Sequence, residues 1–229
     1  MFEKINEWIK WLDGAIWGLP LIIFILAAGI FMTIRLGGLQ IRKLPKALKY
    51  MVKNEEGGHG EVSSFGALCT ALSATIGTGN IVGVATALVA GGPGALVWME
   101  LSALFGMATI FTESVLAVRF RRRDHRGQWA GGPMYVMEAA FGRRAGRLLG
   151  TVFSLFAVGA SLGIGSLTQA NAIADALSST FALPAGPVGL VTAGLALLGI
   201  LGGIRSIAKV TSVLVPVMAV LYLAAGLVV

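Results

Sequence analysis

The sequence predicts an all-α integral membrane protein with six transmembrane helices. Of its 229 residues, 56% are hydrophobic and only 13% are charged, and the mean hydropathy is +0.82. In a soluble chain about a quarter of the residues are charged, so soluble folds are excluded. The charged residues gather between long apolar runs, and no run shows the two-residue alternation of a barrel strand. The net charge of +7 therefore does not indicate a nucleic-acid partner.

Each predicted transmembrane helix corresponds to one apolar run. The runs cover residues 16–34, 63–90, 91–118, 148–174, 186–204 and 210–229. At about 1.5 Å per residue, each run is long enough to cross a hydrocarbon core of about 30 Å. The residues before the first run mix acidic and basic side chains, unlike the basic start of a signal peptide, so we expect this run to remain in the mature protein.

The basic residues predict the orientation of these helices. Sixteen of the 18 Lys and Arg residues lie in three segments, 35–62, 119–147 and 205–209. Cytoplasmic loops carry an excess of basic residues, which places these loops in the cytoplasm and the amino terminus outside. We expect a multi-pass protein of the plasma membrane, of the bacterial inner-membrane type. The arginines from Arg119 to Arg126 could also bind anionic headgroups of the membrane lipid, but a topogenic role is the simpler explanation.

The second run predicts a helix that is broken at its centre. Gly77 and Gly79 flank Thr78 at the midpoint of 28 uncharged residues. Glycine disfavours helix, and Thr and Asn compete for backbone hydrogen bonds, so we expect regular helical bonding to fail between Thr75 and Asn80. Such a break persists in lipid only where protein, water or ligand satisfies the freed backbone groups.

The two half-helices would suit a zwitterion and a small cation. Carbonyls at the negative end of the first half-helix, from Ser73 to Ile76, suit sodium. Amides of Thr78, Gly79 and Asn80 open the second half-helix and suit a carboxylate. The alternative is that the glycines, including Gly83, only let a neighbouring helix approach.

The fourth run carries polar residues between positions 166 and 175. Gln169 lies four residues after Gly165 and shares its helix face, so we expect Gln169 to reach past the glycine into a cavity. A hydrogen bond between helices is the alternative role for Gln169. Asn171 points about 200° away and is expected to pack by hydrogen bonding against a neighbouring helix.

Catalytic and metal-binding motifs are missing from the sequence. The single cysteine, Cys69, lies inside an apolar run and is expected to pack as a small core residue. His59 and His125 lie in the predicted cytoplasmic loops, outside any zinc-protease or serine-hydrolase motif. We therefore expect no enzyme and no cofactor, with sodium as a coupling ion only.

Four longer motifs resemble the alanine or glycine:cation symporter family. They are TALSATIGTGNIVGVATA at 70–87, GGPMYVMEAAFG at 131–142, TQANAIADAL at 168–177 and GGIRSIAKVTSVLVPVMAVLY at 202–222. The resemblance runs from about Phe65 to the last residue. It implies sodium-coupled symport of alanine or glycine on a LeuT-type inverted-repeat fold.

The resemblance also implies roles for individual residues. GTGN at 77–80 is similar to the unwound turn that holds the substrate carboxylate, and Gln169 would face the substrate. Carbonyls of Ser73 and Ile76 would hold sodium. Two positions depart from the family pattern: Glu100 stands where an aromatic or apolar residue is usual, and Ile110 where a lysine is frequent.

The resemblance divides the chain into two parts. Residues 1–62 would hold the external amino terminus, the leading helix and a basic cytoplasmic loop. Residues 63–229 would form the first five-helix repeat of the transporter core. The second, carboxy-terminal repeat is absent, so the chain is expected to contribute half of the site. The alternatives are a non-transporting membrane remnant, or a half-transporter or channel-like assembly.

Overall fold

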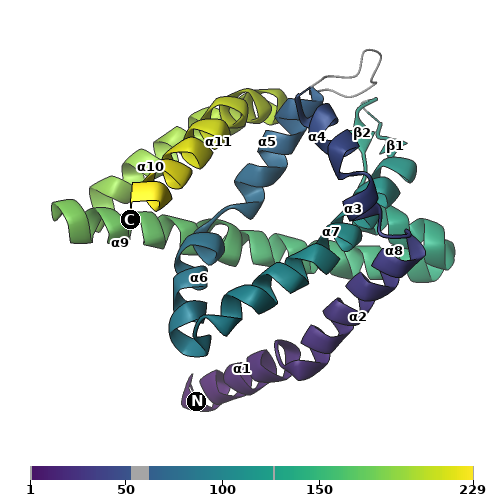
Figure 1. Ribbon diagram of the computed structural model, residues 1–229, viewed down its shortest axis with the longest axis horizontal. Coiled ribbons are helices and arrows are strands. Elements are labelled where there is room, and N and C mark those ends of the chain that lie inside the picture. Colours follow the sequence, from purple (N-terminus) through teal and green to yellow (C-terminus); the bar gives the residue numbers. More distant parts are fainter. Residues whose placement is uncertain (1, 53–61, 126, 229) are drawn as a thin grey trace. The chain divides into compact units, whose positions relative to one another are not determined.

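The computed structural model describes residues 2–52, 62–125 and 127–228, and almost all of them are helical (Figure 1). The helices are α1 (Phe2–Ile16), α2 (Leu19–Arg35), α3 (Leu39–Arg42), α4 (Leu44–Val52), α5 (Ser64–Thr75), α6 (Thr78–Gly91), α7 (Gly94–Arg119), α8 (Pro133–Leu162), the π-helix η1 (Gly163–Leu167), α9 (Thr168–Phe181), α10 (Ala185–Leu201) and α11 (Gly203–Val228). Two-residue strands β1 (Arg122–Arg123) and β2 (Trp129–Ala130) pair antiparallel. The predicted all-α class is confirmed, with this small hairpin added. Part of the predicted loop 35–62, including His59, lies outside the described residues.

Several helices are long and apolar enough to cross a membrane. In the described chain these are Glu3–Arg35, Gly94–Arg119, Pro133–Phe181 and Gly203–Val228. A fifth span results if the bent pair α5 and α6 is counted as one. The remaining predicted run, 186–204, is the shorter helix α10, of 17 residues. The observed helices therefore support a multi-pass membrane protein with four or five candidate spans.

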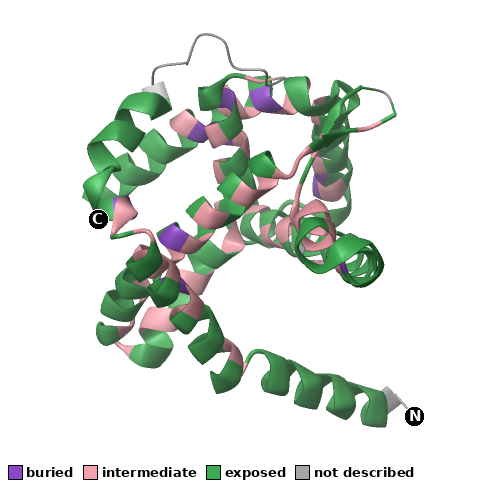
Figure 2. Ribbon diagram, turned by 90° about the vertical axis from the view of Figure 1, so that its right-hand side faces the viewer, coloured by how far each residue is buried: buried purple, intermediate pink, exposed green. Residues whose placement is uncertain are grey.

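The chain divides into two compact units. The first comprises Met1–Leu44 and Pro93–Leu155, and the second comprises Pro45–Gly92 and Phe156–Val229. Few of the described residues are buried in either unit, and most of the ribbon in Figure 2 has the colour of exposed residues. Lipid tails are as apolar as leucine, so exposed apolar side chains are compatible with a membrane protein.

In the first unit, α2 packs against α7 through small residues. A Cβ added at Gly29 would lie 3.0 Å from the Cβ of Phe105, and Ala108 is 1% exposed. Such small residues let two helix backbones approach closely in a membrane. The α2 and α7 runs therefore form a tight helix pair.

The start of α8 contains a chain reversal that the sequence analysis did not predict. Gly142 has φ 77°, a left-handed conformation that favours glycine, and it divides α8 into two arms. The arms lie very close: a Cβ added at Gly146 would meet Met137 O, and one at Gly150 would lie 3.1 Å from Met134 O. The two glycines thus allow the first arm to pack onto the second.

In the second unit, α5 packs along α11. Gly66 and Cys69 are buried on α5, and Cys69 is only 2% exposed. The hydroxyls of Thr70 and Thr211 lie 3.2 Å apart and link the two helices. Cys69 is therefore the packing residue that the sequence analysis expected. The same unit contains the contacts of α9 with α6 and α10.

Candidate functional site

The helix break predicted between Thr75 and Asn80 is present. The last helical bond of α5 runs from Ile76 N to Leu72 O at 2.8 Å, after which Ile76 and Gly77 adopt extended backbone angles. Helix α6 then begins, with Asn80 N donating to Gly77 O at 3.1 Å. The two half-helices meet at a bend of 46°. The break therefore covers Ile76 and Gly77, within the predicted range.

The side chain of Gln169 lies at this break. Its Oε1 accepts a hydrogen bond from Thr78 N at 3.4 Å, and this amide has no partner in its own helix. A Cβ added at Gly77 would lie 2.7 Å from Gln169 Nε2. Helix α9 thus brings Gln169 against the break, and the absence of a side chain at Gly77 makes room for the amide.

Gly79 does not belong to the unwound turn, contrary to prediction. It lies in the first turn of α6, and a Cβ added there meets no described atom within 4 Å. At Gly83 the nearest such atom is Thr78 O of the same helix, at 4.0 Å. Among the described residues, these two glycines therefore allow no close helix approach. Gly77 is the tightly packed position, and its neighbour is a side chain.

The carboxyl end of α5 presents the oxygens predicted to bind sodium. Leu72 O is the last carbonyl of α5 that accepts a helical hydrogen bond, so the carbonyls from Ser73 to Ile76 come after it in the chain. The hydroxyls of Ser73 and Thr75 donate to carbonyls of the preceding turn, Thr70 O and Ala71 O, both at 2.8 Å. The hydroxyl protons are therefore engaged within α5. Sodium binding by Ser73 and Ile76 stays a prediction.

A cavity opens where α6 bends away after the break. It measures about 330 Å³ and is lined by Ile76, Asn80 and Ile81 together with four residues of α11: Met218, Ala219, Tyr222 and Leu223. Because α5 packs along α11 and α6 departs at 46°, the bend creates this space. The sequence analysis missed α11 as a wall of the site. The only polar signal in that stretch is Tyr222, four residues after Met218.

Helix α9 begins from a π-helix, which the sequence analysis also missed. Thr168 N donates to Gly163 O, the five-residue spacing of a π turn. Gly165 lies within this turn, so its four-residue spacing to Gln169 does not run through regular α-helix. π turns are frequent at functional sites. The two glycines at 163 and 165 were the available signal.

The role predicted for Asn171 is wrong. Its Nδ2 donates to Asp175 Oδ2 of the same helix at 3.1 Å, and both side chains are exposed. A side-chain pair four residues apart on one helix satisfies the amide locally. Among the described residues, Asn171 therefore bonds within α9 and not to a neighbouring helix.

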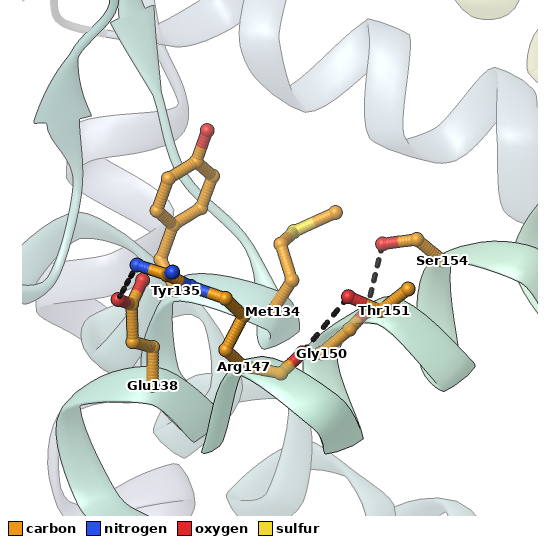
Figure 3. Close-up of a pocket in the computed structure, with 7 residues that line it drawn as sticks. All are labelled: Met134, Tyr135, Glu138, Arg147, Gly150, Thr151 and Ser154. Atoms are coloured by element: carbon orange, nitrogen blue, oxygen red, sulfur yellow. Dashed lines mark hydrogen bonds and ion pairs between the residues drawn. The ribbon is translucent and has the colours of Figure 1, made fainter. Parts of the chain in front are cut away.

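Two further cavities lie in the first unit. Figure 3 shows one of about 290 Å³ between the arms of α8, where Glu138 pairs with Arg147. The other, of about 350 Å³, is lined by residues of α2, α7 and α8 and includes Thr109, Thr112 and Glu113. Neither contains a residue of the predicted substrate or sodium site.

Comparison with known proteins identifies relatives over nearly the whole chain. The model of the sodium:alanine symporter family matches residues 2–229. A transporter of Haemophilus influenzae is 52% identical over 219 residues, and the sodium/alanine symporter AgcS of Methanococcus maripaludis is 47% identical over 224 residues. The probable sodium/glutamine symporter GlnT of Bacillus subtilis is 34% identical over 215 residues.

These alignments cover 95%, 96% and 92% of this chain, respectively. They cover 47%, 49% and 44% of the relatives, so the chain spans about half the length of the curated relatives it matches. The family consists of symporters and not enzymes, as expected from the sequence. The match over residues 2–229 shows that this chain belongs to the sodium:alanine symporter family.

Proposed function

We propose that the protein carries out sodium-coupled symport of a small neutral amino acid, alanine or glycine, across the plasma membrane. This chain contributes one half of the binding site. The observation that carries the proposal is the break at Ile76 and Gly77, with Gln169 hydrogen-bonded to the first amide of α6. An interrupted helix in a membrane needs partners for its backbone groups, and a transported ligand is one such partner.

The substrate carboxylate would bind at the amide end of the break. Amides of Thr78, Gly79 and Asn80 start α6, where the helix dipole favours negative charge. Gln169 would contact the same substrate, beside the space at Gly165. Sodium would bind at the opposite end, on the carbonyls of Ser73 and Ile76, where the dipole favours a cation.

The names of the relatives favour alanine as the substrate. The relative named as an alanine symporter is 47% identical, whereas the one named as a glutamine symporter is 34% identical. A small substrate also suits a site that Gln169 already approaches closely at Gly77. Glycine differs from alanine by one methyl group, and alanine is the proposed substrate.

The proposed architecture is a LeuT-type core, of which residues 63–229 form the first five-helix repeat. The relatives are about twice as long as this chain, which supports a second, carboxy-terminal repeat that completes the site. In such folds the site lies between two repeats, and alternating access needs both. A non-transporting remnant, or a half-transporter that assembles in another way, is the competing function.

Uptake by the protein at its natural length tests this proposal. In proteoliposomes with an inward sodium gradient, labelled alanine should accumulate, and it should not accumulate when potassium replaces sodium. Gly79→Leu should abolish uptake and leave membrane insertion intact, because a large side chain occupies the space of the carboxylate. Uptake that ignores the sodium gradient would contradict sodium coupling. Near-normal uptake by the leucine variant would contradict the carboxylate position.

The proposed topology has an external amino terminus and a cytoplasmic segment 119–147. Cysteines introduced at Lys10 and Arg144 should react from opposite sides with an impermeant thiol reagent. The natural cysteine, Cys69, is 2% exposed and provides a silent background. Labelling of both positions from outside would overturn this orientation.

A further inference from the structure

The segment between α7 and α8 is folded in a way that a merely topogenic loop does not require. Strands β1 and β2 pair Arg122 with Ala130 and Arg123 with Trp129. The guanidinium carbons of Arg121 and Arg123 lie 4.1 and 4.9 Å from the centre of the Trp129 ring. Stacking on an indole holds a guanidinium by its face and leaves its N–H edge free to donate. The hairpin therefore fixes two cationic donors.

Glu138 ties this hairpin to the arms of α8. Its two carboxylate oxygens pair with Arg122 at 3.3 Å and with Arg147 at 3.4 Å. Figure 3 shows the pair with Arg147 across the cavity between the arms. One carboxylate thus joins the hairpin to the region just after the reversal at Gly142, where Arg143 and Arg144 lie.

Positive charge exceeds negative charge by far in this segment. Residues 119–147 contain eight arginines and only two acidic residues, Asp124 and Glu138. Glu138 is shared by two arginines, and in the described part of the chain neither Arg143 nor Arg144 forms an ion pair. Both side chains are exposed. We call Arg121, Arg123, Arg143 and Arg144 the arginine surface.

The arginine surface is joined directly to candidate membrane spans on both sides. One span ends at Arg119, two residues before Arg121, and the apolar run of the next span, Pro133–Phe181, begins at residue 148, four residues after Arg144. An arginine so close to the end of a span lies at the level of the lipid headgroups. Basic side chains at this level attract anionic lipids, each raising the affinity by a factor of about five.

We propose that the arginine surface is a binding site for anionic phospholipid headgroups. Charge complementarity selects the occupant: the phosphates of an anionic leaflet meet the guanidinium edges of Arg121 and Arg123, which Trp129 positions, and the exposed side chains of Arg143 and Arg144. Tyr135 and Thr151 line the cavity beside Glu138 and Arg147. The arginine surface contains no residue of the proposed amino-acid site.

Lipid retention by the protein at its natural length tests the proposal. The protein is reconstituted in nanodiscs that contain phosphatidylglycerol and phosphatidylcholine in both leaflets, extracted into mild detergent, and its retained lipids are quantified by mass spectrometry. We expect enrichment of phosphatidylglycerol over the nanodisc composition, and less enrichment at high salt. Arg143→Gln/Arg144→Gln should reduce the enrichment at least about five-fold. Arg143→Lys/Arg144→Lys should retain most of it.

The matched control is Lys46→Gln/Lys49→Gln, which removes the same charge from exposed positions of α4. The proposal is supported if Arg143→Gln/Arg144→Gln loses the enrichment and Lys46→Gln/Lys49→Gln keeps it. Equal loss in these two glutamine variants would mean that net charge alone attracts the lipid, and it would refute the proposed lipid site. Unchanged enrichment in the arginine variant would also overturn it. Since both leaflets contain the anionic lipid, an inverted topology does not alter these outcomes.

Discussion

Two interruptions of helical structure, one in each compact unit, differ in what satisfies them. At Gly142 the chain reverses with a positive φ, and the two arms of α8 close on each other through Gly146, Gly150 and the Glu138 ion pairs. At Ile76 and Gly77 the helix opens with extended angles, and a glutamine from another helix fills the gap. The reversal is complete within its own helix, whereas the break depends on an outside group.

This difference separates a structural interruption from a ligand site. At Gly142 the contacts are backbone against backbone, so the geometry is fixed by packing. At Gly77 the contact is the end of a flexible side chain, and its hydrogen bond of 3.4 Å is long. A ligand can displace or share such a contact. Mutations at the two places should therefore affect different properties.

The largest expected effect is that of Gly146→Ala on stability. The new Cβ would run into Met137 O and lie 2.6 Å from the Cα of Glu138, so two backbones must separate. Overpacking of this kind costs typically about 1 to 3 kcal/mol or more of unfolding free energy. The measurement is the Tm of the purified protein in detergent. Gly159→Ala is the control, because its Cβ meets no described atom within 4 Å. Equal Tm values for the two variants would refute the close-packed reversal.

The next effect is that of Gln169→Ala on transport. The variant removes the half-buried group that fills the break and leaves Thr78 N without its partner. A polar group without a partner costs about 1 to 3 kcal/mol, or roughly 5- to 150-fold in alanine affinity. Alanine binding and uptake are measured at matched membrane abundance. Asn171→Ala, which removes only the exposed bond to Asp175, should change alanine affinity little. A greater loss of affinity with Asn171→Ala than with Gln169→Ala would show that the substrate binds on the other face of α9.

A smaller effect is expected for Gly77→Ala. The extended angles of Gly77 suit any residue, so the cost arises only from displacing Gln169 Nε2, which lies 2.7 Å from the new Cβ. Loss of one net hydrogen bond should lower alanine affinity roughly 2- to 13-fold. The double variant with Gln169→Ala should bind alanine no more weakly than Gln169→Ala alone, because the displaced group is then absent. Additive losses would show that Gly77 has a separate role.

The smallest effect is expected for Gly79→Ala. Gly79 is helical and its Cβ direction is open, so alanine should raise the unfolding free energy by at most about 1 kcal/mol through helix propensity. The measurement is the Tm of Gly79→Ala, compared with the Tm of Gly77→Ala. A marked loss of stability would mean that Gly79 belongs to the unwound turn after all.

The features predicted well from the sequence were those with strong local signals. The apolar runs are helical, and Gly77 marked the break because glycine disfavours helix. Gly79 has the same propensity but lies in α6. Gln169 was singled out by its spacing from Gly165, although a π turn intervenes between them. Its contact with Thr78 N depends on how α9 meets α6, which the sequence does not state.

The missed features depend on packing between distant residues. The reversal at Gly142 is set by contacts of Gly146 and Gly150 with the preceding arm, and no turn motif announces it. The α11 wall of the cavity is apolar like the rest of that helix. The bond of Asn171 to Asp175 on the same helix was missed. Helical spacing of four residues was the available clue.

The π-helix before α9 determines which residue reaches the break. A π turn holds more residues than an α turn, so α9 starts at an angular phase that regular winding of the same residues would not produce. Rewinding Gly163–Leu167 as α-helix would advance α9 by about one residue, or about 100° around its axis. Gln169 would then leave Thr78 N, although no residue of the site had changed. The winding of η1 thus decides which residue of α9 contacts the break. In a related chain, one residue inserted or deleted in η1 would bring a neighbouring side chain into this contact.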